Sequence, residues 1–130
     1  MLSHKIEARK SEINGIGLFA KSDIAKGEVV WQDDDSVIKF KMSEIEGLQP
    51  QLQEFIIKYV GSTLDEKIHL DTDEGIHLNH SCDPNTGLAD DKLTEIALRD
   101  IKKDEEITIN YLDFPVNQEL GFDCKCEKHN

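Results

Sequence analysis

The chain has 130 residues and a mass of 14.8 kDa, enough for one domain with a modest hydrophobic core. Its 27 acidic and 15 basic residues give a formal net charge of −12. This balance argues against direct nucleic-acid binding, which needs a concentrated basic surface, and favours basic partners instead. Three cysteines make a poor disulfide framework.

The N-terminal residues contain no apolar stretch after a basic start, so we expect no signal peptide. No window approaches the roughly 20 apolar residues that a membrane span requires. We therefore expect an intracellular protein that is neither secreted nor embedded in a membrane.

Short runs that alternate or are β-branched predict strands along most of the chain, because Gly, Asp and Asn separate them. These runs cover residues 5–10, 17–21, 28–32, 36–40, 67–71, 93–99 and 107–111. Apolar residues at helical spacing over residues 52–60 predict one helix, with Pro50 in its first turn and Gly61 ending it. Ser43, with Glu46 three residues later, predicts the N-cap of a shorter helix. The expected fold class is mainly β with one or two short helices.

The first segment of chemical interest is Gly-Ile-Gly-Leu-Phe-Ala, at residues 15–20. Two glycines around Ile16 allow a tight turn and a close approach of the backbone to a ligand. Most glycine pairs of this kind are ordinary turns, and the third glycine of a dinucleotide-binding motif is missing.

Three further segments lie later in the chain. Asn-His-Ser-Cys-Asp-Pro-Asn at residues 79–85 favours a turn, although a turn alone does not require His80 and Cys82. Glu-Ile-Thr-Ile-Asn-Tyr at residues 106–111 predicts a strand after a charged turn. Cys124 and Cys126 could chelate a metal together with Cys82, or all three could be buried free thiols.

In this order the four segments closely resemble a SET domain, the fold of protein-lysine methyltransferases. The resemblance extends from about residue 5 to the end of the chain. It implies a mainly β SET-domain fold of several small folded-over sheets with a C-terminal pseudoknot. It also implies a SET domain over residues 1–115, with a variable insert at about residues 42–62, and a cysteine tail over residues 116–130.

The resemblance implies transfer of a methyl group from S-adenosylmethionine to a lysine amine of a basic protein such as a histone. Tyr111 matches the family's catalytic tyrosine, which also lies at the donor. The residues expected to bind the donor are Gly15, Ile16, Gly17, Leu18, Asn79, His80 and Tyr111. The family commonly has an aromatic residue beside the lysine channel. Here the corresponding positions are Leu88 and Ile109, which predicts a roomier channel and more than one methylation.

The resemblance also implies a zinc site formed by the loop cysteine Cys82 and the tail cysteines Cys124 and Cys126. The usual fourth ligand would fall at position 131. Either His129 replaces it, or the sequence given stops just before it.

Acidic residues cluster at residues 33–35, 71–74, 90–91 and 104–106. Such runs are usually a solvated face, but around an enzyme that acts on lysine-rich tails they would attract the substrate. A catalytically silent SET module that binds a protein or peptide is the main alternative, and a small zinc-stabilised interaction domain is a second. A hydrolase has little support, since no third residue is placed to orient His80 and Ser81.

Overall fold

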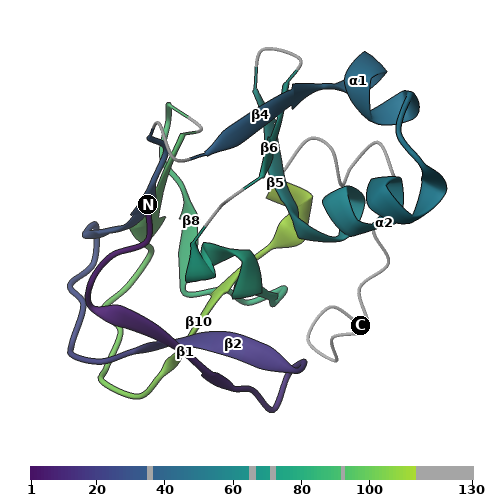
Figure 1. The fold of residues 1–130 in the computed structure, drawn as a ribbon. Coiled ribbons are helices and arrows are strands. Elements are labelled where there is room, and N and C mark those ends of the chain that lie inside the picture. The colour runs from purple at the N-terminus through teal and green to yellow at the C-terminus, as the bar shows by residue number, and fades with distance from the viewer. Residues whose placement is uncertain (35–36, 65–66, 71–72, 92, 114–130) are drawn as a thin grey trace.

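We describe residues 1–34, 37–64, 67–70, 73–91 and 93–113 of a computed structural model of the chain (Figure 1). Short strands dominate these residues, as the sequence predicts. The strands are β1 (Ile6–Lys10), β2 (Ile16–Ala20), β3 (Val29–Gln32), β4 (Ile38–Lys41), β5 (Val60–Leu64), β6 (Lys67–Leu70), β7 (Asn79–His80), β8 (Thr86–Leu88), β9 (Thr94–Ala97) and β10 (Glu106–Ile109). The helices are α1 (Met42–Glu46) and α2 (Pro50–Tyr59), with the 3₁₀ turns η1 (Glu74–His77) and η2 (Tyr111–Asp113).

The strands form three small sheets, in agreement with the expected mainly β fold of folded-over sheets. Their strand orders are β1-β2-β10-β7, β3-β9-β8 and β4-β6-β5. In Figure 1 the β4-β6-β5 sheet lies with the two helices at the top, and the β1-β2 hairpin lies at the bottom. The threading of the C-terminal tail stays a prediction, because residues 114–130 lie outside the described residues.

Strand β10 joins the parts of the chain that carry the motifs. It pairs antiparallel with β2, with Ile107 opposite Leu18, and parallel with β7, with Ile109 opposite His80. The strand from the C-terminal motif therefore lies between the strand of the glycine motif and the strand of the Asn-His motif. Residues far apart in sequence meet on one sheet.

A hydrophobic core lies beneath this sheet and the β3-β9-β8 sheet. Leu18, Ile24 and Ile107 are each only 1% exposed, and Ile101 is fully buried. Burying such a side chain contributes about 1.5–3 kcal/mol. In β2 the Leu18 side chain lies in this core, while Ile16, at the start of the strand, is 49% exposed.

The helices differ from the sequence prediction at their ends. Ser43 is not an N-cap, because α1 begins at Met42 and the Glu44 carboxylate accepts the backbone N–H of Lys41 (3.0 Å). The second helix begins at Pro50 as predicted, but Gly61 lies inside strand β5, which the sequence did not predict. The antiparallel pairing of β5 with β6 supplies backbone partners that local sequence does not reveal.

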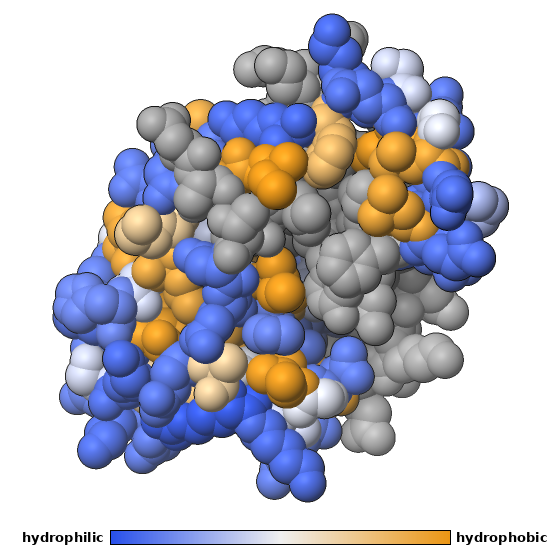
Figure 2. Space-filling view, viewed as in Figure 1, coloured by the Kyte–Doolittle hydropathy of each residue, from blue (hydrophilic) through white to orange (hydrophobic). Residues whose placement is uncertain are grey.

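The surface view shows hydrophilic side chains over most of the coloured part of one face, with small apolar groups between them (Figure 2). Within the described ranges, no helix is long and apolar enough to cross a membrane.

Candidate functional site

The glycine motif begins at the end of the turn between β1 and β2 and continues as β2, and its two glycines have different roles. Gly15 has a φ of +43°, a left-handed conformation that favours glycine, and a Cβ built on it would meet no atom within 4 Å. A Cβ on Gly17 would lie 2.4 Å from Glu106 Oε2 and 3.0 Å from Asn79 Nδ2. Gly15 therefore shapes an open turn, whereas Gly17 makes room for side chains of this protein.

The Asn79 amide ties the glycine turn to β10. Its Nδ2 donates to Glu106 Oε2 (2.9 Å) and lies 3.2 Å from Ser11 Oγ, 3.2 Å from Asn14 O and 3.3 Å from Ile16 O. Ser11 Oγ in turn donates to the Glu106 carboxylate, 2.7 Å from Oε1 and 3.0 Å from Oε2. These contacts bring together one residue from each of three motifs, Ile16, Asn79 and Glu106. They also include Ser11 and Asn14, which the sequence analysis did not single out.

His80 connects the same strand to Tyr111. The backbone N–H of Tyr111 donates to His80 Nδ1 (3.0 Å), so the proton of a neutral ring lies on Nε2, which is 3.3 Å from Cys82 Sγ. The rings of His80 and Tyr111 are 5.3 Å apart and tilted by 59°. His80 therefore fixes the position at which the chain leaves β10.

The sequence predicted that the strand extends to Tyr111. In the structure β10 ends at Ile109, and Tyr111 begins η2. Asn110 ends the strand, because its Oδ1 accepts the backbone N–H of Leu112 (3.0 Å) and its carbonyl accepts that of Asp113 (2.9 Å). The Tyr111 hydroxyl donates to the carbonyl of Leu78 (2.5 Å).

The electrostatic surroundings keep this hydroxyl protonated. Burial raises the pKa of Tyr111 to about 12, and the negative charges of Glu106 and Glu95 act in the same direction. At neutral pH the group is therefore a hydrogen-bond donor and not a base.

Both residues predicted to line a substrate channel pack in the same apolar cluster as Tyr111. Ile109 is fully buried, Leu88 is half-buried, and Phe40 and Leu78 pack against the same cluster. The structure thus brings Leu88, Ile109 and Tyr111 together, with aliphatic side chains at the two positions of interest.

Asn85 holds the loop after the Asn-His motif against β10. It is 2% exposed, donates from Nδ2 to the carbonyl of Glu106 (2.7 Å) and to Glu105 Oε2 (2.9 Å), and accepts the backbone N–H of Thr108 (2.8 Å). Arg99 pairs with the same Glu105 carboxylate (2.7 Å). The loop is thereby fixed where it leaves the site.

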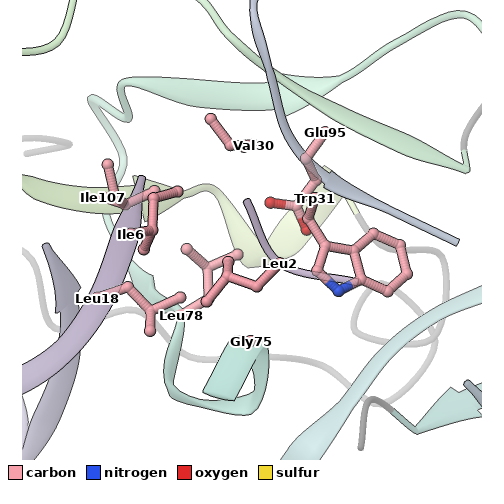
Figure 3. Close-up of a pocket in the computed structure, with 9 residues that line it drawn as sticks. All are labelled: Leu2, Ile6, Leu18, Val30, Trp31, Gly75, Leu78, Glu95 and Ile107. Carbon is pink, nitrogen blue, oxygen red and sulfur yellow. The ribbon is translucent and has the colours of Figure 1, made fainter. Parts of the chain in front are cut away.

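A separate cavity of about 10 Å³ lies in the main core. In Figure 3 the Glu95 carboxylate and the Trp31 ring lie together at one end, and Ile6, Leu18 and Ile107 at the other. The cavity has room for about one water molecule, so it is far too small for a nucleoside-sized donor.

The predicted metal ligands are mostly outside the described residues. Cys124, Cys126 and His129 all lie there, while Cys82 is half-buried, with its Sγ 3.3 Å from His80 Nε2. Among the residues that the structure describes, no group of three His, Cys, Asp or Glu side chains could hold a metal ion.

Sequence reasoning missed Ser11 and the inward orientation of Glu106. Glu106 belongs to the motif quoted for the strand, but it was grouped with the acidic surface residues. Its carboxylate instead binds Ser11 and Asn79 inside the site. The signal in the sequence that could have identified it is its position at the start of the strand that leads to Tyr111.

Comparisons with known proteins agree with this arrangement. The family model described as the SET domain matches residues 15–112. The "Variant-silencing SET domain-containing protein" of Plasmodium falciparum (isolate 3D7) is 28% identical over 141 residues, covering 96% of this chain and 5% of that protein. "Histone-lysine N-methyltransferase ATXR2" of Arabidopsis thaliana is 40% identical over 65 residues, covering 39% of this chain and 14% of that protein.

The chain thus spans only a small part of the length of these curated relatives. Among solved structures, the crystal structure of a "putative histone methyltransferase" of Plasmodium falciparum, PFL0690c, matches with a TM-score of 0.61 and 24% identity. The match covers 85% of this chain and 95% of that one. At this identity, the likeness concerns the fold.

Proposed function

Because this chain belongs to the SET-domain family, whose members are generally lysine methyltransferases, we propose that it transfers a methyl group from S-adenosylmethionine to a lysine side chain of a protein. The observation that carries the proposal is the hydrogen bond from the Tyr111 backbone to His80 Nδ1. It joins the expected catalytic residue to the expected donor-binding pair.

The residues at the glycine turn fit the amino-acid end of the donor. Gly15 leaves open space beside the turn, and Ile16 is half exposed. Asn79 Oδ1 accepts no hydrogen bond from any residue within the described ranges, while Nδ2 faces four oxygens. A free acceptor oxygen suits an ammonium group. When bound, S-adenosylmethionine supplies an electrophilic methyl group on a sulfonium sulfur.

Tyr111 orients the reacting lysine in this proposal. Its hydroxyl stays protonated at neutral pH, and it lies in the apolar cluster with Ile109 and Leu88. An apolar channel favours the neutral amine that the reaction requires, because burial disfavours the ammonium form. Tyr111 therefore contributes by positioning through its hydroxyl, and no proton transfer to it is needed.

The aliphatic residues at the channel support more than one methylation. Leu88 and Ile109 occupy the positions at which the resemblance implies an aromatic residue, and neither has a polar group that would hold the amine in a single orientation. Mass spectrometry over a long reaction would then show di- or trimethyl-lysine, whereas a product that stays monomethylated would contradict this part of the proposal.

The substrate class that we propose is a basic protein such as a histone. The net charge of −12 supports it, because an acidic surface raises the encounter rate with lysine-rich segments. One relative is named as a histone-lysine methyltransferase.

We further propose a zinc ion held by Cys82, Cys124 and Cys126, with His129 or a residue outside this sequence as the fourth ligand. Thiol ligands are a donor set that structural zinc prefers, and the resemblance to family members with a cysteine tail supports the site. Elemental analysis of the purified protein tests it, and a metal-free protein with full activity would contradict a structural role.

Incubation with labelled S-adenosylmethionine and a panel of basic proteins, followed by mapping of the modified residue, tests the activity. Tyr111→Phe removes only the hydroxyl, so we expect donor binding to persist while transfer falls by about 10²-fold, the cost of misplacing the amine. Donor binding without transfer to any protein by the wild type would favour the catalytically silent binding module instead.

A further inference from the structure

The Glu106 carboxylate occupies an unusual place for a residue of an acidic run. It accepts hydrogen bonds from Ser11 Oγ (2.7 Å) and Asn79 Nδ2 (2.9 Å), on the inner side of the glycine turn. Glu105, its neighbour, turns to the other side and binds Arg99 and Asn85. The Glu106 carboxylate thus binds residues at the glycine turn, whereas the Glu105 carboxylate binds Asn85, in the loop after the Asn-His motif.

The contacts of Glu106 decide which way the Asn79 amide points. Nδ2 carries two hydrogens and faces Glu106 Oε2 together with the carbonyls of Asn14 and Ile16. All three of these oxygens can only accept hydrogen bonds. The reversed amide would place Oδ1 against them, which is unfavourable, and the negative charge of Glu106 makes it more so.

Ser11 completes the arrangement from the side of the turn. Its hydroxyl donates to Glu106 and accepts the backbone N–H of Ile13 (2.9 Å), while its own N–H donates to the carbonyl of Gly15 (2.8 Å). The Glu106 carboxylate is therefore hydrogen-bonded to Ser11, the residue that closes the turn. The absence of a side chain on Gly17 leaves the space in which the carboxylate lies.

We propose that Glu106 and Ser11 are positioning residues of the donor site. They hold the Asn79 amide with its oxygen toward the donor ammonium and hold residues 11–17 in the binding conformation. This inference rests on the proposed function, because it assigns the free oxygen of Asn79 to the amino-acid end of S-adenosylmethionine. Neither residue has to touch the reacting atoms.

Two ligands separate this role from a general effect on folding. S-adenosylhomocysteine carries the amino-acid end, whereas 5′-methylthioadenosine keeps the nucleoside and the sulfur but lacks it. For Glu106→Ala, calorimetric titration should show S-adenosylhomocysteine binding weakened by about 10-fold or more, because a charge-assisted hydrogen bond that fixes the amide is lost. Binding of 5′-methylthioadenosine should change by less than about threefold, since its contacts do not include that amide.

Two more variants sharpen the comparison. Glu106→Gln keeps an oxygen that can accept from Asn79, so it should restore most of the lost affinity. Glu105→Ala is the matched control, because it removes the adjacent carboxylate with its own two partners. It should lower the stability and leave the ratio of the two affinities unchanged.

Amide hydrogen exchange of the donor-free protein gives an independent readout. Glu106→Ala and Ser11→Ala should each accelerate exchange at residues 11–17 by about tenfold, as one stabilising hydrogen bond is lost. Parallel weakening of both ligands, or unchanged exchange in the turn, would overturn the positioning role. If the wild type binds no S-adenosylhomocysteine, the proposed function fails. Separately, if Glu106→Ala leaves amide exchange at residues 11–17 of the donor-free protein unchanged, Glu106 does not stabilise the turn.

Discussion

Replacing Gly17 with alanine places a methyl group where the Glu106 carboxylate lies. The new Cβ would be 2.4 Å from Glu106 Oε2, so the carboxylate must withdraw by about 1 Å to reach ordinary van der Waals contact. That movement would stretch its hydrogen bonds with Ser11 (2.7 Å) and Asn79 (2.9 Å) beyond bonding distance.

The cost follows from those two losses. A hydrogen bond to a charged group contributes about 1.5–3 kcal/mol, and water that reaches the half-buried carboxylate offsets part of this. We expect Gly17→Ala to lower the free energy of unfolding by about 2–4 kcal/mol, within the range for overpacking. Gly15→Ala is the control, because Gly15 lies in the turn that leads into β2. It meets no atom, and its cost of about 1–2 kcal/mol arises from the left-handed backbone alone.

Urea unfolding of Gly17→Ala, Glu106→Ala and the double variant measures the coupling. Once Glu106 is truncated, the nearest of the atoms that remain is Asn79 Nδ2, 3.0 Å from the methyl group. Gly17→Ala should then cost less by about 1.5 kcal/mol or more in that background. If the losses in unfolding free energy of the two single variants add up to that of the double variant within about 0.5 kcal/mol, the reasoning is refuted. Such additivity would show that the carboxylate does not fill this space.

Three other predictions concern the rest of the site. Since the pKa of Tyr111 is raised to about 12, the stability that its protonated form contributes is fully present below its ordinary pKa of about 10 and is lost as the pH rises toward 12. A spectrophotometric titration should therefore show a step near pH 12 that Tyr111→Phe removes. If Tyr111→Phe instead removed a step near pH 10, the burial argument would be contradicted. Asn85→Ala should lower the unfolding free energy by about 3–5 kcal/mol, because it leaves the buried N–H of Thr108 without its partner; a loss below about 1 kcal/mol would mean that the loop holds without it. The KM for a lysine-rich peptide should rise as salt is raised from about 50 to 300 mM, since screening weakens attraction by the acidic surface, and a KM independent of salt would argue against steering.

Local patterns in the sequence predict much of the fold. The alternation around Leu18 and Ile107 identifies strands that do lie in the core, and the apolar spacing over residues 52–60 identifies α2. Strand β5 could not be predicted in the same way. Its residues follow directly on the helical stripe, and its backbone is satisfied by β6, a partner that the sequence pattern did not link to it.

The candidate site likewise contains residues that the sequence identifies and others that depend on distant partners. The resemblance of the motifs to the SET family is enough to select Gly15, Asn79, His80 and Tyr111, and all four lie on or beside the β2-β10-β7 strands. The role of Glu106 could not be read from its neighbours, because charge clustering made it resemble a surface residue. Its direction is determined by Ser11, which is 95 residues away in sequence.

The pairing of β10 with both β2 and β7 also has a kinetic consequence. Ser11 and Glu106 meet across 95 residues, and His80 and Tyr111 across 31. Contacts of such high sequence separation form slowly, because a long loop must close before any of them contributes. The core shares this delay, because Leu18 and Ile107 meet across the same pair of strands. The proposed donor site should therefore form together with the core and after local secondary structure. In a refolding experiment, binding of S-adenosylhomocysteine should return with the slowest phase of the fluorescence of Trp31, whose strand pairs with Glu95.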